Sequence, residues 1–159
     1  MDTYYDEIFV GYDDLHRKEQ EKKLRIIANN LKVSPSDKLL DVGCGTGFSK
    51  EFFDCEWIGV DPAKNLLKKS LGKTVCASAE SLPFSDDSFD IVISVTAIHN
   101  FSNFKKGFLE MKRVGKEKFV FSILKCSKSF GEINKFINSF FKISEVVEEE
   151  KDVIFFCFL

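Results

Sequence analysis

Three closely spaced glycines have the pattern of a loop that cradles a ligand. Gly43, Gly45 and Gly47 follow the run from Leu39 to Val42, which predicts a short buried strand. Glycine permits φ > 0 and leaves no Cβ in the way, so a ligand can approach the backbone of such a turn closely. Phenylalanines at helical spacing come directly after it. A strand, a glycine turn and a helix N-terminus together suit an anionic or polar ligand.

An acidic residue downstream strengthens this interpretation, because a glycine turn alone is a weak signal. The residues from Trp57 to Val60 predict a second strand, and Asp61 closes it. A carboxylate at that strand end can accept hydrogen bonds from both hydroxyls of a ribose. Asp61 would also suit a helix N-cap, since Pro62 occupies a plausible first helical position and leucines follow as far as Gly72. The two roles are compatible.

The two motifs together resemble a known family. The stretch from Asp41 to Gly47, followed by a Gly-Val-Asp-Pro run that ends at Pro62, resembles class I S-adenosylmethionine-dependent methyltransferases, in particular the type 11 group. The resemblance extends from about Tyr5 to the C-terminus. A nicotinamide-dependent oxidoreductase is the alternative, but its dinucleotide fingerprint requires a glycine at the position of Phe48. The spacing Gly-x-Gly-x-Gly therefore favours a methyltransferase.

The resemblance implies a fold. It is a seven-stranded Rossmann-like α/β sheet, mostly parallel with a C-terminal antiparallel hairpin, in strand order 3-2-1-4-5-7-6 and with right-handed crossovers. We expect a single domain, in which residues 1–35 form an N-terminal lid and helix and residues 36–159 form the cofactor-binding core. The hydrophobic pattern agrees, because it predicts helices over 14–31, 103–114 and around 133–140, and strands over 39–42, 57–60, 74–77, 89–95, 119–124, 143–149 and 153–159.

The resemblance also implies roles near the methionine end of the cofactor. In that family the acidic residue at the position of Asp41 helps to hold the methionine amino group, and the N-terminal segment closes over the cofactor. Tyr12 is then a candidate lid residue, although its ring could instead pack on the core. Arg17 or Lys18 could pair with the methionine carboxylate, or could be solvated surface charges.

The adenine end shows a departure from the family pattern. Ser78, Ala79 and Glu80 stand where the family usually has Asp-Ala-Glu, and the aspartate there accepts from the adenine amino group. A serine hydroxyl can still accept a hydrogen bond, but more weakly than a carboxylate. The predicted cofactor-binding residues are Tyr12, Asp41, Gly43, Gly45, Gly47, Asp61, Pro62, Ser78, Ala79, Glu80 and Ser94.

The acceptor must approach at the end of the fourth strand. The run from Phe89 to Val95 is nearly all apolar, as a strand covered on both faces should be, and residues 96–100 would face the methyl group. His99 is the titratable residue there and could take a proton from a hydroxyl or an amine. A loop histidine bonded to backbone is the alternative. The Asn/Asp-Pro-Pro-Tyr/Phe and Pro-Cys motifs of other methyltransferases are absent.

The composition argues against several other classes of protein and site. With 159 residues we expect one domain with a single core. The five cysteines form no Cys-x-x-Cys pair, so neither a zinc site nor a disulfide framework is expected, and a reducing cytoplasm fits. No apolar run is long enough to predict a membrane span. A net charge of −2 gives no global attraction to nucleic acid.

The predicted function is metal-independent methyl transfer from S-adenosylmethionine to an unidentified acceptor, which could be a small molecule, RNA or a protein. The alternative is a catalytically silent cofactor-binding subunit that supports a partner protein. The chain has no large insertion to cap the acceptor side, so a homodimer or a partner subunit could complete the pocket. Four lysines after the fourth and fifth strands could attract an anionic acceptor, or could be ordinary solvated charges: Lys105, Lys106, Lys125 and Lys128.

Overall fold

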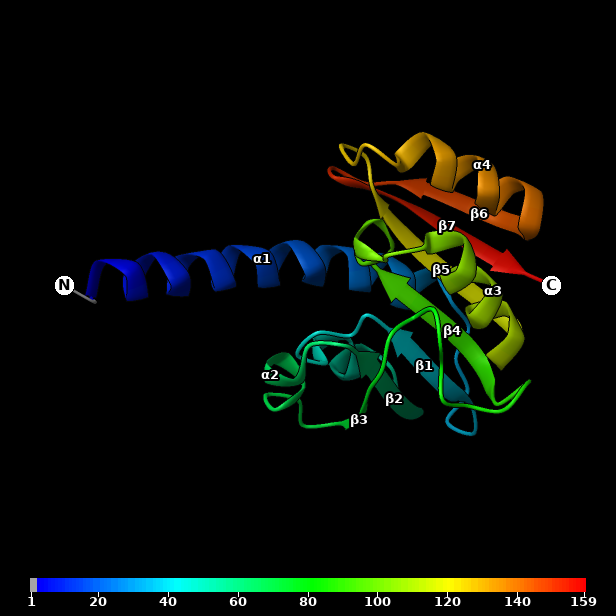
Figure 1. Cartoon of the computed structure of the whole chain (residues 1–159), viewed down its shortest axis with the longest axis horizontal. Coiled ribbons are helices and arrows are strands. Elements are labelled where there is room, and N and C mark those ends of the chain that lie inside the picture. Colours follow the sequence, from blue (N-terminus) through cyan, green and yellow to red (C-terminus); the bar gives the residue numbers. More distant parts are fainter. Residues whose placement is uncertain (1–2) are drawn as a thin grey trace.

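A seven-stranded sheet forms the centre of the molecule, in the predicted order β3-β2-β1-β4-β5-β7-β6 (Figure 1). The computed structural model describes the backbone of residues 3–159 and the side chains of residues 15–159. Every neighbouring pair from β3 to β5 is parallel, and β7 runs antiparallel between β5 and β6. The strands are β1 (Lys38–Val42), β2 (Glu56–Asp61), β3 (Lys73–Cys76), β4 (Phe89–Val95), β5 (Gly115–Leu124), β6 (Lys142–Glu148) and β7 (Asp152–Phe158).

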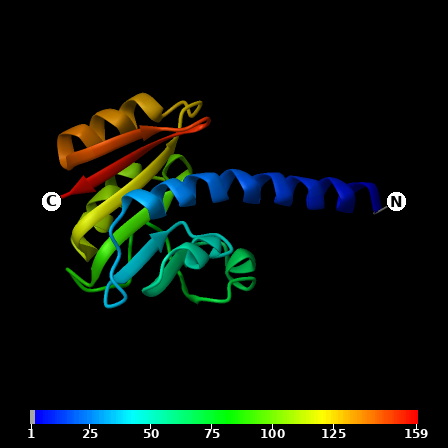
Figure 2. The ribbon, with the colours of Figure 1, turned by 180° about the vertical axis from the view of Figure 1, so that it is seen from behind.

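Helices cover both faces of this sheet (Figures 1 and 2). One face packs against α1 and the short 3-10 helix η1, and the other packs against α3 and α4. Within the described part of the chain, no helix is both long and apolar enough to cross a membrane. The helices are α1 (Thr3–Asn30), η1 (Phe48–Phe52), α2 (Lys64–Leu67), η2 (Ile98–Asn100), α3 (Phe104–Val114) and α4 (Phe130–Phe140).

Helix α1 begins well before the predicted residue 14 and extends beyond the sheet (Figure 1). Its second half is held by apolar side chains: Leu24 and Ile27 are buried among Leu39, Trp57 and Ile91 of the sheet. The side chain of Tyr12, the predicted lid residue, lies outside the described residues.

On the opposite face, phenylalanine rings fill the space between α3, α4 and the sheet. The ring of Phe108 lies with its centroid 5.0 Å from Phe121 and 5.4 Å from Phe136. Helix α3 ends at Val114 as predicted and begins at Phe104, one residue after the predicted start, because Asn103 caps it by accepting a hydrogen bond from the N–H of Lys106 at 3.1 Å.

Two predicted helices are wrong in type or length. After the glycine turn the chain forms only the five-residue η1, because the buried Ser49 is tied to the sheet by hydrogen bonds. The helix predicted from Pro62 to Gly72 is only the four-residue α2, which begins at Lys64. Leu71 is 95% exposed, so the end of the predicted apolar face has no surface to pack on, and a helical turn without tertiary support is marginal.

Candidate functional site

The glycine loop joins β1 to η1 and is fixed to the end of β2. The N–H groups of Gly43 and Cys44 both donate to the carbonyl oxygen of Val60, at 2.8 and 3.1 Å. Gly43 and Gly45 have φ of 79° and 54°, in the left-handed region that favours glycine. A Cβ on Gly43 would lie 2.6 Å from the Cβ of Ala97, whereas a Cβ on Gly45 would meet nothing within 4 Å. The loop is therefore tightly packed on one side and open at Gly45.

The carboxylate of Asp61 lies against the open part of this loop. One of its oxygens accepts the N–H of Gly45 at 2.9 Å, and the other accepts the N–H of Ala63 at 2.8 Å. Each oxygen keeps a further lone pair for an outside donor. The N-cap of α2 is Ala63, so the predicted N-cap role of Asp61 is wrong. Pro62 lies between the two residues as part of this turn.

Asp41 places a second carboxylate beneath the loop. Its side chain is buried, and one oxygen accepts the hydroxyl of Ser49 at 2.5 Å, while Ser49 accepts the indole N–H of Trp57 at 2.9 Å. The other oxygen is buried and has no hydrogen-bond partner among the described residues. Burial raises the pKa of Asp41 to about 7, and the nearby charge of Asp61 adds to this, against the hydrogen bond from Ser49. The free oxygen can accept a donor from outside the chain.

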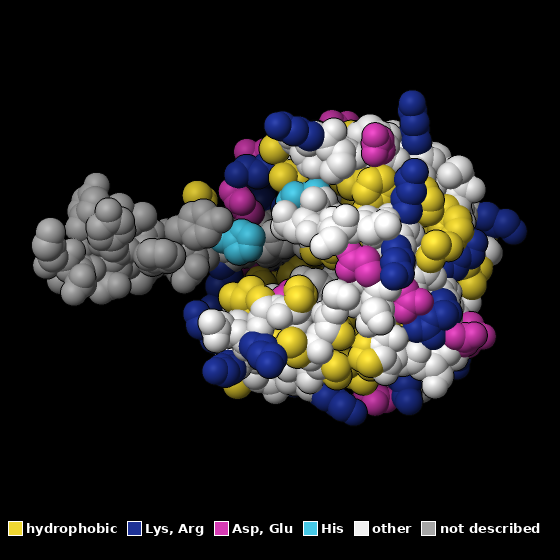
Figure 3. All heavy atoms as spheres, in the orientation of Figure 1, with side chains coloured by type: hydrophobic (Ala, Val, Ile, Leu, Met, Phe, Trp, Pro, Cys, Tyr) yellow, Lys and Arg dark blue, Asp and Glu magenta, His cyan; other side chains and the backbone are white. Residues whose placement is uncertain are grey.

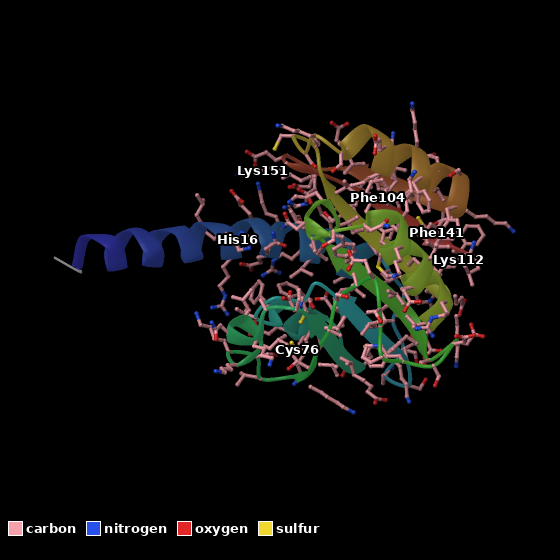
Figure 4. The ribbon with its side chains drawn as sticks, viewed as in Figure 1. His16, Cys76, Phe104, Lys112, Phe141 and Lys151 are labelled. Carbon is pink, nitrogen blue, oxygen red and sulfur yellow. The ribbon has the colours of Figure 1, made fainter. Side chains whose placement is uncertain are left out.

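The predicted adenine side follows β3, whose last residue, Cys76, is labelled in Figure 4. Ser78 is exposed and Ala79 is buried. Glu80 accepts the N–H of Asn103 at 2.9 Å, so its carboxylate also holds the start of α3. These three residues stay predicted cofactor contacts.

Ser94 has a different role from the one predicted. Its side chain is fully buried in β4, and its hydroxyl donates to the carbonyl oxygen of Val42 at 2.8 Å. Val42 directly precedes Gly43. Ser94 therefore supports the glycine loop from within the sheet, where a fully buried hydroxyl does not face a ligand.

At the end of β4 the chain turns sharply into η2. Thr96 has φ of 52°, which is rare for a β-branched residue, and His99 lies half-buried two residues past Ala97. The Nδ1 atom of His99 is buried and has no hydrogen-bond partner among the described residues, so the alternative of a backbone-bonded histidine is wrong. Burial lowers the pKa of His99, Asp152 raises it, and Lys23 lowers it further. The imidazole is therefore neutral at neutral pH and able to accept a proton.

Beside the glycine loop, α1 contributes one of the two predicted cations. The guanidinium of Arg17 lies 4.6 Å from the centre of the Phe48 ring and 3.9 Å from the carboxylate of Glu51. Both charged side chains are 62% exposed, so this pair adds little to stability. Lys18 is exposed and forms no ion pair within the described part of the chain.

Sequence reasoning missed a cluster of four polar side chains close to His99. They come from α1, from the position just after β4, and from β5 and β7: Lys23, Thr96, Ser122 and Asp152. No motif marks them, because the four residues are far apart in the sequence. One signal was available, since Lys23 precedes Ile27 by four positions and therefore shares the buried face of the helix.

The arrangement fits the cofactor that the resemblance implies. The free oxygen of Asp41 suits an ammonium group, the remaining lone pairs of Asp61 suit ribose hydroxyls, and the open space at Gly45 allows close approach to the backbone. All three features meet at the glycine loop, because Asp41 lies in β1 just before the loop and Asp61, at the end of β2, is hydrogen-bonded to Gly45.

Comparison with known proteins gives the family. A model described as a methyltransferase domain matches residues 40–122. The uncharacterised protein MJ1252 of Methanocaldococcus jannaschii is 34% identical over 125 residues, which are 74% of this chain and 48% of that protein. A demethylmenaquinone methyltransferase of Corynebacterium urealyticum is 32% identical over 112 residues, 67% of this chain and 46% of that protein. The chain thus spans about half the length of these relatives.

A solved structure supports the same assignment. The crystal structure of the YcgJ protein of Bacillus subtilis superposes with a TM-score of 0.63 at 27% identity, and covers 75% of this chain and 57% of that chain. From the matching domain, the strand order and the glycine loop together, the chain belongs to the class I S-adenosylmethionine-dependent methyltransferase family.

Proposed function

We propose that this chain transfers a methyl group from S-adenosylmethionine to a nucleophile on an acceptor molecule. The observation that carries the proposal is the buried oxygen of Asp41, which has no partner among the described residues and lies beneath a glycine loop hydrogen-bonded to Asp61. When bound, the cofactor supplies a methyl group that is already electrophilic because it is attached to a sulfonium sulfur. The chain must then hold the cofactor, align the acceptor's nucleophile with the methyl carbon and the sulfur, and exclude water from the site.

Each part of the loop has its own task in this proposal. Asp41 would accept a hydrogen bond from the methionine ammonium group, and Asp61 would accept from the ribose hydroxyls. Ser78, which is exposed, has a hydroxyl that is free to accept from the adenine amino group. Tyr12 remains a predicted lid residue.

On the acceptor side, His99 is proposed as the general base. Its lowered pKa keeps the imidazole neutral at neutral pH, and its buried Nδ1 lacks a partner among residues 15–159. A neutral imidazole can take the proton that leaves the acceptor's hydroxyl or amine as the new bond to the methyl group forms. The proton then resides on His99 until solvent removes it.

We also propose that the reaction proceeds without a divalent metal. A methyl group on a sulfonium needs no Lewis acid to become electrophilic, in contrast to a carbonyl or a phosphoryl group. The rate should be the same with EDTA and with added magnesium. A rate that vanishes with EDTA and returns with magnesium would contradict this part of the proposal.

Incorporation of a labelled methyl group into fractionated cell extract tests the proposed function. We expect label in one acceptor fraction with the parent protein and a strongly reduced rate with His99→Ala, whose pH–rate profile should lose the limb that reports the imidazole. His16→Ala is the matched control, because His16 is the other histidine and lies on α1 (Figure 4). Cofactor binding without any incorporation would instead support the silent subunit.

A further inference from the structure

A buried ion pair lies at the acceptor edge of the sheet. The ammonium of Lys23 lies 3.0 Å from one carboxylate oxygen of Asp152, and their side chains are 2% and 0% exposed. The other oxygen of Asp152 accepts the hydroxyls of Thr96 and Ser122, each at 2.7 Å. Lys23 also donates to the hydroxyl oxygen of Thr96 at 3.0 Å. Burying two charges is costly, so a pair retained in this position calls for a role beyond stability.

The cluster holds Thr96 in an unfavourable conformation. A β-branched residue with φ of 52° persists only where its surroundings hold it. Here the hydroxyl of Thr96 is fixed between Lys23 and Asp152, and its N–H donates to the carbonyl oxygen of Ser122 at 2.9 Å. The left-handed turn at Thr96 directs the chain into η2, where Ile98 is buried and His99 is half-buried.

We propose that the Lys23–Asp152 ion pair is a positioning pair for the acceptor side, which fixes through Thr96 where the loop of residues 96–100 presents His99. This inference rests on the proposed function only because it takes His99 to be the general base. Lys23 and Asp152 are positioning residues and touch neither cofactor nor acceptor in this account.

The surroundings of the pair support a dedicated role. Among the described residues, two further ion pairs join α1 to the turn between β6 and β7: Glu19 with Lys151, and Lys22 with Glu150 at 3.2 Å. Lys151 is labelled in Figure 4. These outer pairs are partly or largely exposed and would hold the helix only weakly. The buried pair, in contrast, joins α1 to Thr96 after β4 through the hydrogen bonds of Lys23 and Asp152 to its hydroxyl.

The two buried charges also act on His99 with opposite signs. Asp152 raises the pKa of His99 and Lys23 lowers it, and among the described residues these are the charged groups that act on the imidazole. An anion and a cation must act with opposite signs, so the two shifts show that both charges lie close enough to His99 to be sensed there. The sign of each effect can therefore be measured separately from any change in folding.

The first test is an NMR titration of the His99 imidazole in the cofactor-free protein, with His16→Gln to assign the two histidine signals. We expect Lys23→Met to raise the pKa of His99 and Asp152→Asn to lower it. Shifts in the same direction, or none, would overturn the proposal. Each single variant leaves one buried charge unpaired and could therefore be unstable. If a single variant does not fold, the double variant Lys23→Met/Asp152→Asn, in which neither charge remains, provides the folded comparison.

The second test changes Thr96 and leaves both charges in place. Thr96→Val keeps the shape but removes the hydroxyl, and we expect kcat to fall about tenfold with an unchanged KM for S-adenosylmethionine, because the misplaced base affects only the chemical step. Thr96→Ser keeps the hydroxyl and should recover most of the loss. An unchanged kcat in a folded Thr96→Val protein would overturn the proposal. If the parent transfers no methyl group, the proposed function fails, while opposite NMR shifts would still place both charges beside His99, and altered His99 signals in Thr96→Val would still support the positioning pair.

Discussion

Asp41 carries a carboxylate into the interior of the protein, and this makes folding sensitive to pH. Its pKa is about 7 in the folded state, against an ordinary value of 3.8. The folded protein therefore binds a proton that the unfolded chain releases, so the stability contributed by the protonated carboxyl is present below pH 4 and is lost as the pH rises through 7.

We predict that Asp41→Asn abolishes this dependence. The free energy of unfolding of the parent, relative to that of the variant, should fall by about 2–4 kcal/mol between pH 4 and pH 8, because one pKa unit corresponds to about 1.4 kcal/mol. Urea unfolding of both proteins over this range measures the difference. Parallel curves would show that Asp41 is not the titrating group.

Among single residues, the sequence pattern identified those whose type is essential and whose spacing is fixed. Gly43, Gly45 and Asp61 were found because a tight turn and a ribose-binding carboxylate each demand one residue type at one position. Lys23 and Asp152 were missed because their pairing depends on how α1 and β7 pack, and this is set by the whole fold.

The glycine loop is an element in which packing and ligand space can be separated by mutation. Gly45→Ala should cost only about 1–2 kcal/mol of stability, from its left-handed φ, yet block cofactor binding by filling the open space. Gly43→Ala should cost more stability, about 2–4 kcal/mol, because its Cβ would also clash with Ala97. Thermal unfolding and calorimetry on each variant measure the two effects. Equal loss of stability in both would contradict the assignment of open and packed sides.

Helix α1 should be held mainly by its second half. Ile27 is fully buried against the sheet, so Ile27→Ala should destabilise the protein by about 2–5 kcal/mol. Leu15 lies on the same helix and is 59% exposed, so Leu15→Ala is the matched control with an expected change below about 0.5 kcal/mol. Denaturant unfolding compares them, and a large effect of Leu15→Ala would show that the start of the helix packs on the domain.

The strands were predicted closely, whereas the short helices were not. A buried strand such as β4 has a nearly continuous apolar run that specifies it locally. The lengths of η1 and α2 depend on tertiary contacts, namely the hydrogen bonds of Ser49 and the lack of a partner surface for Leu71. Neither contact can be read from local periodicity.

At the scale of the whole molecule, the parallel strands bring distant loops to one edge. The glycine loop and His99 follow strands whose carboxyl ends meet there, Asp61 ends a third such strand, and antiparallel β7 adds Asp152 to the same edge. On the face shown in Figure 3, basic side chains are interspersed with acidic ones. Lys125 pairs with Glu148 at 2.9 Å, which removes it from the predicted basic rim.

The remaining lysines of that rim still give a prediction about the acceptor. Lys105, Lys106 and Lys128 form no ion pair within the described part of the chain. If the acceptor is anionic, changing all three to alanine should raise its KM at low salt and weaken the salt dependence, because exposed charges are screened over about 8–10 Å at physiological salt. The control is the same charge change at the opposite edge, at Lys73, Lys116 and Lys142. A change in KM no larger than that of the control would indicate that the acceptor is neutral.

Calorimetry with S-adenosylhomocysteine and with NAD tests whether this loop binds S-adenosylmethionine. The site geometry predicts that the parent binds S-adenosylhomocysteine and not NAD. It also predicts that Asp61→Ala weakens binding by about 1–3 kcal/mol, the usual scale for a charge-assisted hydrogen bond, whereas the exposed control Asp54→Ala leaves it unchanged. Binding of NAD, or equal affinity of the parent and Asp61→Ala for S-adenosylhomocysteine, would contradict the account.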